Sequence, residues 1–137
     1  MLISALYTKY LYVIHLQQRG MNSIMHFSEY EHMAQKSALY PKDEVDGVIY
    51  TAIGLSNESG EVLGKLKKII RDFDGSFSEG VHQNKDVLID ELGDVLWYLC
   101  MLSNEIGTSL EEIAERNNKK LSSRLQNSTI QGTGDKR

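Results

Sequence analysis

Apolar residues recur at steps of three and four along most of the chain, the spacing of a helix that buries one face. The longest such segment runs from about residue 43 to 73, and the next from about 85 to 106. A shorter helix is expected over 27–39, with Ser28 as its cap and Pro41 beyond its end. The pattern therefore predicts a helical subunit in which two long helices supply most of the core.

The segments between these helices contain turn and capping residues. Residues 74–84 are rich in Gly, Ser and Asn and are predicted to form a connecting loop. Gly107 is placed to end the helix over 85–106, and Ser109 with Glu112 forms a capping-box pattern that opens a final helix. Leu110 and Asn117 are expected on the inward face of that helix. Four helices are thus expected, and the fold class is all-α.

The helix over 43–73 contains an unusual number of glycines, each of which weakens a helix by roughly 1 kcal/mol relative to alanine. Three explanations fit: close approach of another helix, a kink, or a loss that the fold tolerates. The glycines are at positions 47, 54, 60 and 64.

Length and charge narrow the class of protein. A chain of 137 residues has room for one domain, and its net charge of -4, without a run of Lys or Arg, argues against a general nucleic-acid binder. The single cysteine, Cys100, has no partner for a disulfide within one chain and lies in an apolar stretch. A buried thiol in a reducing, cytoplasmic location is the expectation.

The ends of the chain are expected to contribute little. Residues 1–24 are apolar, but Lys9, His15 and Arg19 interrupt them, so no membrane span is predicted and the segment is assigned as an N-terminal extension on which function does not depend. Residues 25–126 form the predicted domain, and the polar residues 127–137 a flexible tail.

Four acidic residues stand in two pairs on the long helices: Glu58 with Glu61, and Glu91 with Asp94. Three-residue spacing directs both members of a pair to one side of a helix, here beside the apolar stripe. If the helices pack antiparallel, all four carboxylates converge, and neighbours would repel by roughly 3 kcal/mol per pair at an effective dielectric near 20. Oxygen-only ligands favour Mg²⁺, with Mn²⁺ as a substitute.

The acids have two other interpretations. A single Glu-x-x-Glu pair is ordinarily a solvated helix face, but two pairs beside the core favour a metal site. A di-iron carboxylate bundle normally needs Glu-x-x-His, and no histidine follows any of the four acids at that spacing. The metal-phosphate interpretation is therefore preferred.

Two segments, GLSNESGEVLGKLKKIIRD (residues 54–72) and DELGDVLWYL (residues 90–99), resemble the signature of MazG-like all-α nucleotide pyrophosphohydrolases, Glu-x-x-Glu followed by Glu-x-x-Asp. The resemblance extends from about Phe27 to Arg124. Asn57 departs from it, because many members have another Glu there, and this leaves base specificity open.

The resemblance implies Mg²⁺-dependent hydrolysis of nucleoside or deoxynucleoside triphosphates between the α and β phosphates, clearing unwanted nucleotides from the pool. Glu58, Glu61, Glu91 and Asp94 would bind the metal, and Glu58 or Glu61 would accept the proton of the attacking water. Family members associate as dimers or tetramers, so the bundle is expected to be completed by a second copy. The alternative is a helical interaction module that keeps the acids as a structural metal clasp or a solvated acidic seam and performs no hydrolysis.

Cationic and polar residues on the final helix fit the same interpretation. Asn117, Lys120 and Arg124 follow one another at steps of three and four, and similar stretches in the family contact the phosphates and sugar. Lys65 and Lys68 are further candidates for phosphate contacts, although a plain surface role explains them equally well. Nearby aromatic residues, among them Trp97, could stack on the base, with core packing the preferred role for Trp97.

Overall fold

The computed structural model describes residues 24–42 and 44–131, and in this part of the chain every regular element is a helix. The all-α prediction is confirmed, with one short helix more than the four expected. The helices are α2 (Phe27–Lys36), α3 (Glu44–Asp72), α4 (Phe77–Gln83), α5 (Lys85–Glu105) and α6 (Leu110–Gln126).

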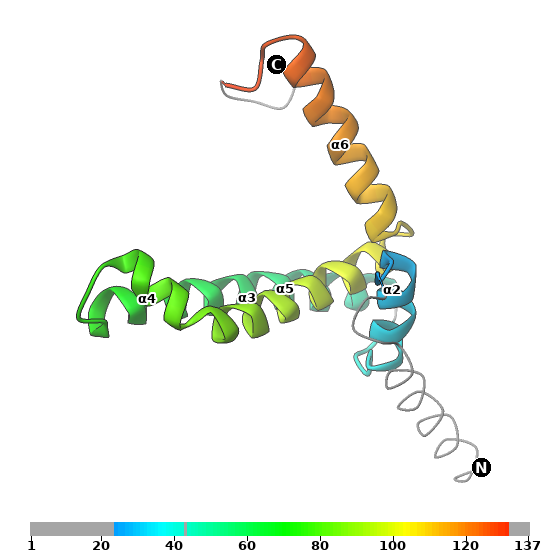
Figure 1. Cartoon of the computed structure of the whole chain (residues 1–137). Coiled ribbons are helices and arrows are strands. Elements are labelled where there is room, and N and C mark those ends of the chain that lie inside the picture. Colours follow the sequence, from blue (N-terminus) through cyan, green and yellow to red (C-terminus); the bar gives the residue numbers. More distant parts are fainter. Residues whose placement is uncertain (1–23, 43, 132–137) are drawn as a thin grey trace.

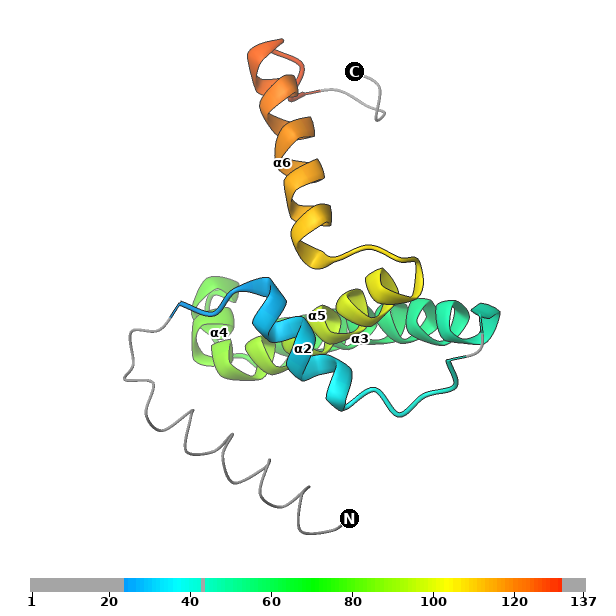
Figure 2. The same ribbon diagram turned by 90° about the vertical axis from the view of Figure 1, so that its right-hand side faces the viewer.

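The two long helices α3 and α5 run antiparallel, side by side, and make the most extensive contact in the molecule (Figure 1). Helix α4 lies at one end of this pair, where the chain turns from α3 into α5. Helix α2 packs on α5 near the other end, and α6 leaves that end and projects away from the pair (Figures 1 and 2). The antiparallel arrangement brings the two acidic motifs onto facing helices.

The loop predicted over residues 74–84 is wrong in its central part, because residues Phe77–Gln83 form helix α4. Ser76 caps this helix by accepting a hydrogen bond from the Glu79 backbone N–H at 3.3 Å, and the Glu79 carboxylate accepts one from the Ser76 N–H at 3.0 Å. This is a capping box, which the sequence contains as Ser-Phe-Ser-Glu. The local signal was present and was outweighed by the glycine and polar content around it.

The other helix ends follow the sequence more closely. The predicted cap Ser28 is wrong, since α2 begins one residue earlier and His26 precedes it, donating its backbone N–H to the Glu29 carboxylate at 3.3 Å. Ser109 caps α6 as predicted, through the Glu112 N–H at 3.1 Å. Gly107 adopts φ +74° just past the end of α5, the left-handed conformation expected of it.

The core lies where α2 and the start of α6 meet the second half of α5. Cys100 and Met101 are essentially inaccessible there. The first turn of α6 is tied to α2, because the Glu31 carboxylate accepts the Leu110 N–H at 2.6 Å. A carboxylate at a helix N-terminus also complements the helix dipole. The remaining buried members of this core are Ala34, Ala38, Tyr40 and Leu110.

The glycines of α3 divide into two kinds. A Cβ at Gly54 would overlap the ring of Tyr98, and one at Gly47 would overlap the side chain of Glu105, so both mark close approach of α5. Gly60 and Gly64 have open space around them. Close approach therefore explains two of the four, and it sets how near the acidic motifs of α3 and α5 lie to each other.

Gly54→Ala is expected to lower the free energy of unfolding by about 1–3 kcal/mol, because the added methyl group must displace the Tyr98 ring. The loss should appear despite the better helix propensity of alanine, which alone would stabilise by about 1 kcal/mol. Urea denaturation measures the change. Gly93→Ala on α5, where nothing lies within 4 Å, is the matched control and should stabilise; equal behaviour of the two variants would contradict the close packing.

In the residues that the structure describes, no helix is long and apolar enough to cross a membrane. The predicted N-terminal extension, apart from its last residue, and positions 132–137 of the predicted tail lie outside the described residues.

Candidate functional site

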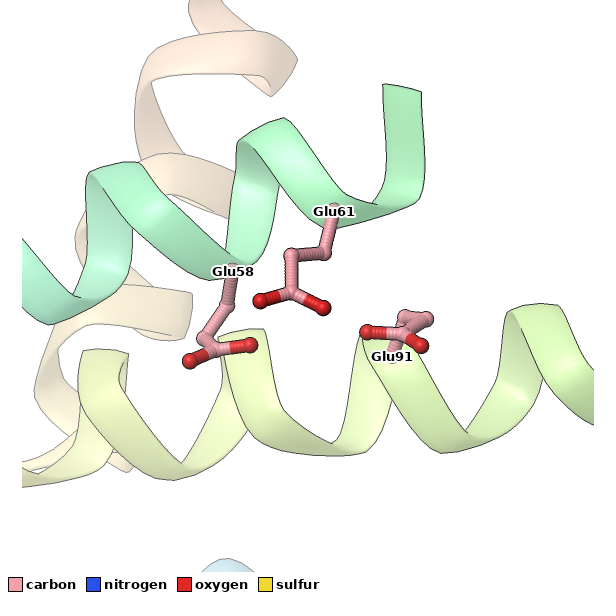
Figure 3. A group of neighbouring side chains, drawn as sticks. All are labelled: Glu58, Glu61 and Glu91. Carbon is pink, nitrogen blue, oxygen red and sulfur yellow. The ribbon is translucent and has the colours of Figure 1, made fainter. Parts of the chain in front are cut away.

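Three of the four predicted acids converge across the α3–α5 contact. Glu58 and Glu61 extend from α3 and Glu91 from α5, and one carboxylate oxygen of each lies within 4.8 Å of the others (Figure 3). Glu58 and Glu91 are partly buried, whereas Glu61 is exposed. Oxygens this close from two helices can share one cation, and no other group of three acidic, histidine or cysteine side chains of this kind occurs in the described residues.

Asp94, the fourth predicted acid, lies outside this group of three. It is one turn beyond Glu91 on α5 and is exposed. Its charge nevertheless reaches the same surroundings: the pKa of Tyr98 is raised by burial, then by a hydrogen bond with Tyr50, and further by the charges of Glu58 and Asp94. Asp94 therefore borders the cluster on the side of Tyr98.

A lysine is the closest cation to the cluster. The Lys65 ammonium lies 2.9 Å from the Glu91 carboxylate, and the Lys65 side chain is 32% exposed against 13% for Glu91. The hydrogen bond to Glu91 and its charge raise the pKa of Lys65. Lys65 follows Glu61 by one helical turn, so the predicted phosphate contact is at the edge of the acidic cluster. It also lines a neighbouring cavity with Lys68.

Asn57, the residue that departs from the family pattern, also contacts the acids. Its side-chain amide donates to Glu61 at 3.3 Å and, more weakly, to Glu58 at 3.5 Å. Amide donors of this kind partly offset the repulsion between the two carboxylates. The sequence marked Asn57 only as a departure from the family pattern, and the amide–carboxylate contact was not predicted.

Four aromatic rings contact one another, and one of them, Tyr98, is influenced by the charge of Glu58. Tyr40 stacks on Tyr50 with ring centroids 5.2 Å apart, and Trp97 meets Tyr98 edge-on at 4.8 Å. The indole of Trp97 donates to the Ser37 hydroxyl at 2.8 Å. Trp97 also packs against the core, which supports the packing role preferred for it. Tyr50 was missed, because it lies among exposed positions of α3 and only the fold brings it to Tyr40.

The cationic residues of the final helix do not join the acids within one chain. Helix α6 contacts α2 and α5 and makes no contact with α3 in the described residues. Asn117, predicted to face inward, is exposed, as is Lys120, while Arg124 is buried with 8% of its surface accessible. Asn117 and Lys120 line a groove of about 490 Å³ with apolar side chains of α2 and α5. The three predicted substrate contacts thus share a helix but not the acidic cluster.

Cys100 is fully buried, as the sequence predicted, and burial raises the pKa of its thiol to about 11, with the charge of Glu31 adding to the effect. We expect the native thiol to react with DTNB at pH 8 at least about a hundredfold more slowly than the unfolded chain, because so little thiolate is present. The measurement is the absorbance of released thionitrobenzoate with and without guanidinium chloride. Equal rates would contradict the burial of this residue.

Comparison with known proteins relates this site to a family. Residues 50–129 match the model of the MazG nucleotide pyrophosphohydrolase domain, a range that contains all four acids and helix α6. The chain belongs to this family. Over 117 residues it is also 41% identical to the "Gene 37 protein" of Mycobacterium phage L5, which covers 82% of this chain and 100% of that protein. No solved structure matches the present chain.

Membership of the MazG family confirms the resemblance on which the site was predicted. The MazG match includes both acidic motifs, and the structure brings three of their four carboxylates together. The name of the phage relative says nothing of a substrate or metal.

Proposed function

We propose that this MazG protein hydrolyses nucleoside or deoxynucleoside triphosphates between the α and β phosphates, giving the monophosphate and pyrophosphate. The observation that carries the proposal is the convergence of Glu58, Glu61 and Glu91 on two facing helices within the matched domain. In this role the protein would remove unwanted triphosphates from the nucleotide pool of a reducing, cytoplasmic compartment.

The donor set fits Mg²⁺, with Mn²⁺ as a substitute. All three grouped side chains offer carboxylate oxygens, the hard ligands that these ions prefer, and they stand on two facing helices. Glu58, Glu61 and Glu91 would hold the metal, with Asp94 as the fourth ligand. When bound, Mg²⁺ supplies positive charge to the phosphate oxygens and lowers the pKa of a bound water.

The chain's own residues then have separable tasks. Glu58 or Glu61 accepts the proton of the water that attacks the α phosphorus. Asn57 donates to both carboxylates and limits their orientations. Lys120 and Arg124 donate to the triphosphate, Lys120 as a point charge and Arg124 as a planar fork, and Asn117 lies on the same helix for the sugar.

A second copy would complete the site, as a homodimer or within a homotetramer. Helix α3 exposes a stripe of apolar side chains on the side away from α5, with Val45, Ile53 and Leu63 each about two-thirds exposed. Contiguous apolar surface of this kind typically marks an interface. The α6 cations also stand away from the acids of their own chain (Figure 1). Both observations favour α6 of one subunit serving the acids of the other.

The test is pyrophosphate release from a panel of ribo- and deoxyribonucleoside triphosphates, with Mg²⁺ and with excess EDTA. We expect release of monophosphate and pyrophosphate in Mg²⁺, near-complete loss in EDTA, and recovery when Mg²⁺ or Mn²⁺ is restored. If the folded protein binds Mg²⁺ but releases pyrophosphate from none of these substrates, the result contradicts the proposal. It would instead favour a helical interaction module that keeps the acids as a structural metal clasp.

A further inference from the structure

A small cavity adjoins the acidic cluster at the α4 end of the α3–α5 pair. It has a volume of about 250 Å³, at the low end for a ligand site, which suits a phosphate group better than a nucleoside. Its wall includes two lysines of α3, Lys65 and Lys68, and the aromatic ring of Phe73. The other lining residues are Ile69, Asp72, Asn84 and Val87.

The charges around this cavity are nearly balanced by pairs. The Asp72 carboxylate receives two hydrogen bonds from Arg71, at 2.5 and 2.6 Å. The charge of Lys68 acts on Asp72 as well, and together with Arg71 it lowers the pKa of that carboxyl. Lys65 is balanced by Glu91 at 2.9 Å. If Lys65 left Glu91, its positive charge at the cavity would no longer be balanced by that carboxylate.

Lys65 belongs to both places, since it lines the cavity and also binds an acid of the cluster. Glu91 is one of the three carboxylates whose oxygens can share a cation, so Lys65 and a divalent ion are rival counter-ions for it. A flexible four-carbon stem lets the ammonium reach either side. Lys65 lies on the same helix face as Glu61, one turn further along, so the two sites it joins are adjacent.

We propose that Lys65 couples metal binding to recognition of the two phosphates that leave as pyrophosphate. A divalent cation displaces its ammonium from Glu91, and Lys65 turns into the cavity, where with Lys68 it binds the β and γ phosphates or free pyrophosphate. The inference rests on the proposed function for its substrate. It assigns a second site, the cavity, to the anion that the acidic cluster itself would repel.

The test uses the full chain with Lys65→Met, Lys68→Met and, as matched control, Lys67→Met, an exposed neighbour that does not line the cavity. Mn²⁺ affinity without nucleotide is measured by the loss of the free-ion EPR signal. Pyrophosphate binding in the presence of Mg²⁺ is measured by calorimetry. Neither reading requires turnover, so a failure of the proposed function and a failure of this inference are distinguishable. Far-ultraviolet circular dichroism checks that each variant is folded, and Lys65→Gln replaces Lys65→Met if that variant is not.

Lys65→Met should bind Mn²⁺ roughly fivefold more tightly, because it loses the ammonium that competes with the ion for Glu91. It should bind pyrophosphate at least about tenfold more weakly, because a charge-assisted hydrogen bond is lost. Lys68→Met should weaken pyrophosphate binding alone, and Lys67→Met should change neither. If Lys65→Met binds Mn²⁺ more tightly but binds pyrophosphate as well as the unchanged protein, the cavity is not a phosphate site. Lys65 would then act only as a counter-ion of Glu91. If neither the Mn²⁺ affinity nor the pyrophosphate affinity changes in Lys65→Met, the proposal is overturned, and Lys65 and Glu91 form a surface ion pair without a role in binding.

Discussion

Glu61→Gln and Asp94→Asn are each expected to reduce pyrophosphate release at least about a thousandfold, which corresponds to ~4 kcal/mol of transition-state stabilisation. Both replacements keep the shape of the side chain and remove its charge, so they test the carboxylates as ligands and proton acceptors. Glu61 belongs to the three-acid group, and Asp94 lies one turn beyond Glu91 on α5. Steady-state rates with Mg²⁺ well above saturation measure the loss.

The same variants should remain folded. Glu61→Gln removes one negative charge from a group of like charges within 4.8 Å, so its free energy of unfolding without added metal should stay level or rise. Asp94 is exposed and lies outside that group, so Asp94→Asn should leave the free energy of unfolding close to unchanged. Glu115→Gln is the matched control, because this acid is exposed on α6 in a loose 3.7 Å pair with Lys119. Its rate and stability should match those of the unchanged protein. Unfolding of Glu61→Gln would instead mark Glu61 as a structural residue.

The long helices and their acids were predictable because their signal is local and repeated. Apolar spacing over many turns fixes which face of α3 and α5 is buried, and the acids sit at known offsets from that face. Once the helices pack antiparallel, Glu58 and Glu91 are bound to approach each other. The burial of Cys100 followed in the same way, from its place in the apolar face of α5.

What the sequence did not reveal depends on contacts between distant residues. The pairing of Lys65 with Glu91 and the stacking of Tyr40 on Tyr50 require the packing of separate elements. Gly54 was recognised as unusual, but only the Tyr98 ring against it shows why a side chain is excluded. Helix α4 is a different case: its Ser76–Glu79 capping box is local, and the helix was missed because about two turns carry too little periodicity to stand out.

The direction of α6 was also beyond the sequence. Its cap and its inward residues near Leu110 were predicted, but the periodicity of a helix says nothing of the angle at which it leaves the body. The structure has α6 project from the end of α5, so Asn117 is exposed instead of facing the core (Figure 2). The acids of α3 and α5 and the cations of α6 were predicted to bind one substrate, but they lie on separate surfaces of one chain. The arrangement of the subunits therefore decides whether they can contact the same substrate.

Mixing two inactive variants should restore activity if the site is shared between subunits. Lys120→Ala alone is expected to lower turnover about 10- to 100-fold, the loss of one charge-assisted contact to phosphate. In a mixed dimer of Glu61→Gln and Lys120→Ala chains, one site would combine intact acids from one subunit with an intact α6 from the other. Random exchange of subunits should then give about a quarter of the unchanged activity.

The measurement is the rate of pyrophosphate release after the two variants are unfolded together, refolded and compared with each variant refolded alone. Glu61→Gln mixed with Glu91→Gln is the matched control, because both changes affect the acidic cluster of a single chain. That mixture should stay inactive, since no subunit in it supplies a complete set of acids. If the first mixture also stays inactive while light scattering shows dimers, α6 acts on the acids of its own chain and must swing toward α3 to do so.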